Sequence, residues 1–226
     1  MKNLILLHGA LGSKVELIAL GKSLSQKYDV HILEFDGHGR TQMKYGFSIP
    51  DFAKNLHTFV VQNNLQGADV FGYSMGGYVA LYMASEHPEL LGNIITLGTK
   101  FHWTPEASAK EVGMLNPEII EEKVPKFANY LAQLHGAEDW KQNMRYTAQL
   151  MYDLGNNELL ENRFASIRNP CFIGLGELDS MVSLEETRHA VRCIPNASYY
   201  NLPNTLHPIG KVDVEVLSGT IKTLLG

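Results

Sequence analysis

Short apolar segments recur along the chain at intervals that suit the strands of a buried sheet. They lie at residues 3–7, 30–35, 93–97, 171–175 and 198–202, and a further one ends at Val70-Phe71. A continuous apolar run of this length is typical of a strand covered on both faces of a parallel sheet. Segments with helical spacing lie between them, including residues 14–28, 50–64 and 210–225. The alternation predicts an α/β fold with a mostly parallel sheet of about six strands and helices on both faces.

Residues 100–166 contain no strand-like run, and their apolar positions repeat at helical spacing. One helix is predicted from Asn116 to Gly136, a second carries Trp140, Met144 and Met151 on one stripe, and a third spans residues 158–167. We therefore expect residues 1–99 and 167–226 to form an α/β core. Residues 100–166 would form a helical cap, or lid, over the carboxyl ends of the strands.

Composition and charge narrow the classes of function. The chain has 226 residues, of which 45% are hydrophobic and 19% charged, and its net charge is -5. Such values are ordinary for a globular domain, and the lack of a basic run argues against nucleic acid as a partner. The two cysteines, Cys171 and Cys193, are expected to be small core residues, and their spacing suggests neither a disulfide framework nor a zinc site.

The first apolar run ends at His8-Gly9, so it is shorter than the roughly 7–15-residue core of an export signal. No segment approaches the roughly 20 apolar residues of a membrane helix. These patterns predict a cytoplasmic protein that acts on a small molecule and has no membrane partner.

The clearest chemical motif is Gly-Tyr-Ser-Met-Gly at residues 72–76. It follows a predicted strand and precedes a helix-forming run, which is the context of the G-x-S-x-G nucleophile elbow. Glycines two positions before and after Ser74 allow a very tight turn to close, and the turn presents the serine oxygen above a helix N-terminus. The plainer alternative is a glycine-rich turn in which Ser74 only caps the helix.

A nucleophilic serine needs a base, and the base needs an acid. Among nine histidines, His207 is the last, and it lies in the final strand-to-helix loop. In nucleophile-elbow enzymes the acid lies between serine and histidine, at the end of a strand. Asp179 fits that position, with Glu177 as an alternative acid. His38 and His102 lie on the same rim and remain alternative bases.

The remaining candidate residues concern the oxyanion and the substrate. Two backbone N–H groups would form an oxyanion hole, one from Met75 and one from Ala10, with Leu11 as the second choice for the latter. Residues expected to line an apolar substrate pocket are Leu11, Phe101, Trp103, Trp140, Met144 and Met151. The alternative for the cap stripe is that it only packs the cap onto the core. This chemistry requires neither a metal nor an organic cofactor.

Taken together, five motifs resemble those of the alpha/beta-hydrolase superfamily. They are Leu-His-Gly-Ala-Leu-Gly-Ser at 7–13, Asp-Gly-His-Gly-Arg at 36–40, the elbow with Gly77, Gly-Glu-Leu-Asp at 176–179 and Leu-His-Pro at 206–208. The resemblance implies an alpha/beta-hydrolase fold with a helical cap and a Ser74–His207–Asp179 triad. The elbow serine argues against the aspartate-based chemistry of haloalkane dehalogenases and epoxide hydrolases.

Two departures from the family pattern bear on partners and substrate. Family members usually begin with an antiparallel strand pair that is missing before residue 3, so the open edge could pair two chains as a homodimer. Two motifs are also similar to those of the menaquinone-pathway enzyme that eliminates pyruvate to form a succinyl-cyclohexadiene carboxylate. That enzyme has an arginine where this chain has Tyr78.

The sequence thus predicts a serine hydrolase that cleaves a small carboxylic ester or thioester through an acyl-enzyme. The lyase that eliminates pyruvate is the second hypothesis, and a carbon–carbon bond hydrolase with the same triad is another. A binding module that kept the fold but lost turnover is the least favoured.

Overall fold

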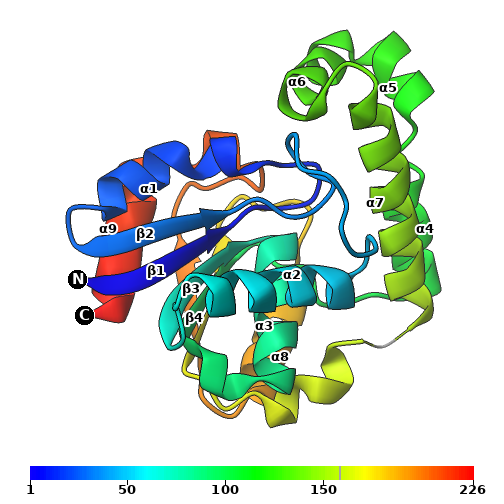
Figure 1. Ribbon diagram of the computed structural model, residues 1–226. Coiled ribbons are helices and arrows are strands. Elements are labelled where there is room, and N and C mark those ends of the chain that lie inside the picture. Colours follow the sequence, from blue (N-terminus) through cyan, green and yellow to red (C-terminus); the bar gives the residue numbers. More distant parts are fainter. Residues whose placement is uncertain (158) are drawn as a thin grey trace.

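Six parallel strands form one sheet at the centre of the computed structural model, which describes residues 1–157 and 159–226 (Figure 1). The order across the sheet is β2-β1-β3-β4-β5-β6. The strands are β1 (Lys2–Leu7), β2 (Tyr28–Leu33), β3 (Ala68–Tyr73), β4 (Leu91–Leu97), β5 (Cys171–Gly176) and β6 (Ala197–Leu202). Each of the six predicted strands is present, and the predicted fold class is confirmed.

Helices cover both faces of the sheet because alternate strand residues point to opposite sides. Leu4 and Leu6 of β1 pack into the cluster formed with α1 (Ile18–Leu24) and α9 (Val214–Leu225). On the other face of the sheet, Ile5 and Leu7 of the same strand pack into a second hydrophobic cluster. This face is covered by α2 (Ile49–Gln62), α3 (Met75–Glu86) and α8 (Leu184–Cys193).

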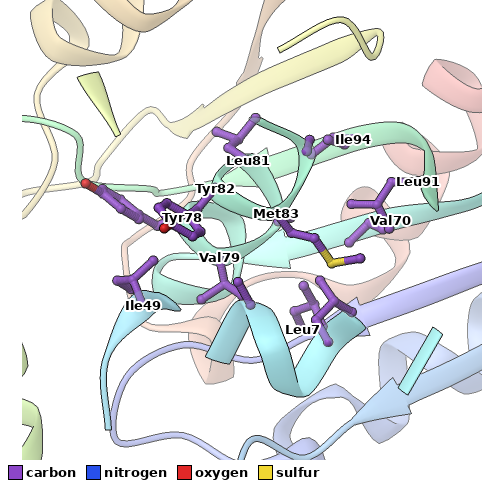
Figure 2. Close-up of a cluster of buried hydrophobic side chains, with 14 of the residues drawn as sticks. Leu7, Ile49, Val70, Tyr78, Val79, Leu81, Tyr82, Met83, Leu91 and Ile94 are labelled. Atoms are coloured by element: carbon purple, nitrogen blue, oxygen red, sulfur yellow. The ribbon is translucent and has the colours of Figure 1, made fainter. Parts of the chain in front are cut away.

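Helix α3 is buried along nearly its whole length. Figure 2 shows its residues Val79, Leu81 and Met83 among Leu7, Val70 and Ile94 of the strands. A helix that is apolar on all sides belongs inside a core, and α3 lies between the sheet and α2. The helix therefore has a fixed position, and so does the turn that leads into it.

The approach of α3 to the sheet is so close that side chains are excluded at two glycines. A Cβ on Gly76 would lie 2.6 Å from the carbonyl oxygen of Leu7, and a Cβ on Gly72 would overlap the backbone of Gly77. These are the two glycines of the elbow motif. Their role is to leave room for backbone contact between β3, α3 and β1.

The described part of the insertion between β4 and β5 contains four α-helices and one 3₁₀ helix, and Figure 1 shows α5 and α6 standing away from the sheet. The α-helices are α4 (Pro105–Val112), α5 (Pro117–Lys123), α6 (Pro125–His135) and α7 (Asp139–Asn156). We call α4–α7 the cap. Helix α4 packs against α7.

The single helix predicted from Asn116 to Gly136 is two helices, and that prediction is wrong in this respect. The break is at Val124, whose backbone has φ -132° and ψ 56°. Proline at 125 excludes the helical conformation at the preceding residue and lacks an N–H to continue the hydrogen bonds. The apolar repeat nevertheless continues across the break, which is why the periodicity did not reveal it.

Other helix limits also differ from the prediction. The helix expected over residues 14–28 is a 3₁₀ turn (Lys14–Leu17) followed by α1, and β2 already begins at Tyr28. The last helix begins at Val214 after a 3₁₀ turn (Ile209–Lys211). A 3₁₀ helix, η3 (Glu161–Ser166), replaces the third cap helix, whose predicted first residue, Glu158, lies outside the described residues.

Strands β2 and β6 are the two edges of the sheet. Pairing of two chains through an open edge stays a prediction. Within residues 1–157 and 159–226, no helix combines the length and the apolar character that a bilayer-spanning helix requires.

We expect Gly76→Ala to lower the free energy of unfolding by about 1–3 kcal/mol, because its Cβ must displace the Leu7 backbone. The matched control is Gly219→Ala in α9, where an added Cβ meets no atom within 4 Å. There the better helix propensity of alanine should stabilise by about 0.5–1 kcal/mol. Urea unfolding followed by circular dichroism measures both, and shifts of the same sign would contradict the packing argument.

Candidate active site

Ser74 occupies the turn between β3 and α3 in a left-handed backbone conformation, with φ 50° and ψ -115°. For a non-glycine residue this conformation costs on the order of 1–3 kcal/mol, and such strain is concentrated at functional sites. Contacts with β4 and the loop after it help to hold it: the Ser74 N–H donates to the Leu97 carbonyl at 2.9 Å, and the Thr99 hydroxyl donates to the Ser74 carbonyl at 3.0 Å. The side chain is partly exposed at the carboxyl end of the sheet.

Asp179 and His207 form a buried pair in the loops after β5 and β6. Asp179 Oδ2 lies 2.7 Å from His207 Nδ1, and the side chains are 2% and 10% exposed. Asp179 Oδ1 accepts the N–H groups of Met181 and Val182 at 2.8 and 3.0 Å. Burial raises the pKa of the Asp179 carboxyl, but the His207 hydrogen bond and charge, with the two backbone N–H groups, outweigh it and the pKa is lowered.

The ionised Asp179 fixes the arrangement of protons on His207. A carboxylate can only accept, so Nδ1 of the imidazole must carry the proton between them. In the neutral ring Nε2 is then unprotonated and has a free lone pair. The ring is thus in the tautomer that a general base requires.

The loop that carries His207 is tied directly to the elbow. The Tyr73 hydroxyl donates to the His207 carbonyl at 2.8 Å, and the two rings are 5.5 Å apart. His207 Nδ1 and Asp179 Oδ2 each lie 3.2 Å from the position of a Cβ on Gly98. Among the described residues no hydrogen bond joins the Ser74 hydroxyl to His207. Such contacts often tighten only when substrate binds.

The alternative residues lie elsewhere. Glu177 accepts the N–H of Asn204 at 2.8 Å and so braces the loop after β6. His38 is fully buried, beside the rings of His8 and His135. His102 is exposed and lines a groove of about 390 Å³ with residues of α8. None of these three makes a hydrogen bond to Asp179 or Ser74 in the described part of the chain.

Ala10 and Met75, the expected oxyanion donors, both line a small cavity that also contains Ser74. Met75 is the first residue of α3, so its N–H has no partner within the helix. Ala10 lies in the loop after β1, where the next residue, Leu11, has φ 57°. This loop is therefore strained as well.

The cavity beside Ser74 has a volume of about 40 Å³. Trp103 and Met151, which the sequence predicted for the pocket, line it. Sequence reasoning missed five further lining residues: Ile49, Tyr78, Lys100, Leu150 and Leu154. The sequence contained a signal for three of these residues. Tyr78 follows the nucleophile by one helical turn, and Leu150 and Leu154 flank the predicted pocket residue Met151 on the same helix. Lys100 and Ile49 had none in the apolar pattern.

The other predicted pocket residues do not line this cavity. Trp140 and Met144 are 2% and 0% exposed and pack with Ala128 and Leu131 in an apolar cluster inside the cap. The side chain of Leu11, from the loop after β1, packs against this cluster. Phe101 packs edge-on against the ring of Phe164, with centroids 5.7 Å apart. No group of three or more His, Cys, Asp or Glu side chains among the described residues is placed to hold a metal ion.

Curated proteins with similar sequences include esterases and lipases. A pimeloyl-[acyl-carrier protein] methyl ester esterase of Photorhabdus laumondii is 27% identical over 123 residues, which is 54% of this chain and 44% of that protein. An sn-1-specific diacylglycerol lipase of Danio rerio is 22% identical over 231 residues, covering 90% of this chain and 72% of the lipase. The match to each of the first three curated relatives spans less than half of that relative's length.

The fold itself is matched by solved structures. A thermophilic esterase of Thermogutta terrifontis, with malate bound, superposes with a TM-score of 0.80 at 19% identity, covering 100% of this chain and 89% of the esterase. The sequence profile of the alpha/beta hydrolase fold matches residues 2–136. That region contains the strained serine, the loop after β1 and three helices of the cap. The chain belongs to the alpha/beta hydrolase fold family.

Proposed function

We propose that this protein is a serine hydrolase that cleaves a small carboxylic ester or thioester through an acyl-enzyme on Ser74. The observation that carries the proposal is the buried Asp179–His207 pair, 2.7 Å apart, on the same rim as a serine in a strained left-handed turn. Relatives that are named esterases and lipases support the reaction class.

In the first half of the reaction Ser74 Oγ attacks the carbonyl carbon. His207 Nε2 takes the hydroxyl proton and later gives it to the leaving group, while Asp179 stabilises the imidazolium that forms between these steps. Water then enters, His207 takes its proton, and the acyl group leaves as a carboxylic acid. Ser74 regains its proton from His207, and the enzyme is restored.

The oxyanion of each tetrahedral intermediate would accept N–H groups from Met75 and Ala10. Backbone donors that are already in place cost no reorganisation when the negative charge develops. The positive end of the α3 dipole points at the same atom and adds to the stabilisation. Removing one such donor typically costs roughly 10²–10³ in rate.

The size and lining of the cavity suggest a short acyl group. Its volume is about 40 Å³, and Lys100 supplies its only charged side chain among the described residues. Lys100 Nζ lies 3.6 Å from Glu111 Oε1, so its charge is already paired. A pyruvate-eliminating lyase acts on a substrate with several carboxylates, which this pocket is poorly suited to hold. We therefore favour ester or thioester hydrolysis over the lyase.

Ser74→Ala should abolish covalent labelling by a fluorophosphonate and lower kcat for p-nitrophenyl acetate by about 10⁴-fold or more. The serine oxygen is the group that becomes acylated, and no other residue replaces it. Labelling is read by mass spectrometry of the intact protein and of its peptides. Ser85→Ala, in the last turn of α3, is the control and should label like wild type. Hydrolysis without labelling at residue 74 would exclude this mechanism.

Asp179→Asn should cost about 1–3 kcal/mol of stability near neutral pH through loss of hydrogen bonds to a charged group. The Asp179 pKa is lowered, so as pH falls the unfolded chain takes up the proton first and wild type loses stability below the ordinary value of 3.8. Asparagine does not titrate. The stability gap between the two proteins should therefore narrow as pH falls toward 3, as measured by urea unfolding at several pH values. A gap that stays constant would refute the assignment of an ionised Asp179.

Met151→Ala should shift the preference toward longer acyl chains by enlarging the cavity next to Ser74. Wild type is expected to prefer p-nitrophenyl acetate to the octanoate by at least about tenfold in kcat/KM, and the variant should reduce or reverse that ratio. Tyr152→Ala changes the neighbouring, exposed residue and should leave the ratio unchanged. An unchanged ratio in Met151→Ala would show that this cavity does not hold the acyl group.

A further inference from the structure

The last residue of α6, His135, links the cap to two loops of the core. Its Nε2 lies 2.9 Å from the carbonyl oxygen of Leu11, in the loop after β1. Its Nδ1 accepts the N–H of Gly39, in the loop after β2, at 3.0 Å. The residue is 2% exposed. Both ring nitrogens are therefore used, and each contacts a backbone group far away in the sequence.

The partners of His135 determine its protonation. The Gly39 N–H can only donate, so Nδ1 must be unprotonated, and Nε2 carries the proton that it donates to Leu11. The ring is neutral and in a single tautomer. A protonated ring would direct a second N–H at the N–H of Gly39, and the contact on that side would become repulsive.

Leu11 depends on the cap in two ways. Its φ of 57° is unfavourable for a leucine, so surrounding contacts must hold the loop in place. One contact is the hydrogen bond from His135. The other is its side chain, which packs into the apolar cluster of the cap formed by Ala128, Leu131, Trp140 and Met144. Both contacts come from the cap, and the residue immediately before Leu11 is Ala10.

A second hydrogen bond ties α6 to the 3₁₀ turn that follows the same loop. The Tyr130 hydroxyl donates to Glu16 Oε1 at 2.7 Å. Glu16 also forms a capping box with Ser13, which closes the loop onto the 3₁₀ turn that follows it. Helix α6 thus holds the segment of residues 9–16 at two points, one of them at Leu11, the residue that follows the expected oxyanion donor.

We propose that His135 is a positioning residue that couples docking of the cap to assembly of the oxyanion hole. It acts through Leu11, whose backbone it holds so that the Ala10 N–H points at the oxyanion site beside Ser74. If α6 and the first half of α7 move away, Leu11 loses its carbonyl partner and its apolar contacts together, and the oxyanion hole loses one donor. Catalysis then requires a docked cap. The role in catalysis rests on the proposed hydrolase function, whereas the coupling of cap and loop does not.

The surroundings of His135 make the contact sensitive to pH. Several titratable side chains face His135 or lie close to it. They are the imidazoles of His38 and His8 and the carboxylates of Glu34, Glu16 and Asp139. Arg40 lines the groove outside it. Burial lowers the pKa of His135 from its ordinary value of 6.5, and nearby His8 adds to this, against the opposing effect of the Leu11 carbonyl and the glutamates. When the cap is undocked, His135 takes up a proton more readily than when the cap is docked. Docking of the cap therefore weakens as pH falls below about 6.5.

The first test compares His135→Phe, which keeps a ring but removes both hydrogen bonds, with His135→Gln, whose amide N–H still reaches toward Leu11. We expect His135→Phe to speed hydrogen exchange in residues 9–13 by about tenfold or more. Its kcat for p-nitrophenyl acetate, per fluorophosphonate-titrated site, should fall by about 10²-fold while KM changes by less than about threefold, the signature of a lost oxyanion donor. His135→Gln should regain most of both. His87→Phe, at the C-terminus of α3, is the control and should match wild type.

The outcomes separate the two proposals. Unchanged exchange in residues 9–13 of His135→Phe, or equal losses in the Phe and Gln variants, would overturn the coupling. Faster exchange with unchanged kcat would overturn the catalytic role of His135. If wild type hydrolyses no ester and takes up no fluorophosphonate, the proposed function fails while the exchange data still decide the coupling.

A second measurement follows wild type itself as the pH changes and uses His135→Gln as the reference. In wild type, exchange of residues 9–13, corrected for the intrinsic effect of pH, should quicken between pH 7.5 and 5, and in His135→Gln it should not. The same pH response in both proteins would overturn the role of His135 protonation.

Discussion

The close contact of α3 with β1 and β3 is the constraint on which the rest of the structure depends. Gly72 and Gly76 remove the side chains that would separate these backbones, and the apolar surface of α3 then fixes the helix in the core. The turn between strand and helix has no room to relax, so Ser74 is held at a positive φ. Burial of α3 thus sustains a conformation that Ser74 would avoid in a free chain. Core packing and the partly exposed Ser74 side chain are two results of one arrangement.

The sequence allowed the inner strands of the sheet to be predicted because they are apolar on both faces. In a protein of this size, apolar runs such as those in β1 and β3 are buried most simply as inner strands of a sheet that is covered on both faces. The positions of Ser74, Asp179 and His207 could be predicted for a related reason, since parallel strands bring their following loops to one rim. Helix limits were harder. A single proline at 125 interrupts a repeat that is otherwise regular, and α4 is too short and too polar to give a clear period.

The lining of the cavity could not be derived from periodicity, and the geometry of α7 explains why. The helix has 18 residues, so Trp140 and Met151 lie about 16 Å apart along its axis. One stripe therefore serves two purposes. Its first half fills the cluster inside the cap, whereas Leu150 and Leu154 in its second half belong to the main core and the cavity wall. A hydrophobic pattern identifies a buried face but does not state what that face is buried against.

The division of α7 between two apolar clusters has a consequence for how the molecule opens. The second half of α7 unfolds only together with the main core. Among the described residues, α6 and the first half of α7 share a cluster of four buried side chains, against which Ile120 of α5 packs. Partial unfolding of this outer unit exposes far less apolar surface than global unfolding and so has a much lower free energy. The cap is therefore anchored at its base and opens locally at its tip. The hydrolase proposed above would admit its substrate through this local opening rather than through the motion of a rigid hinge.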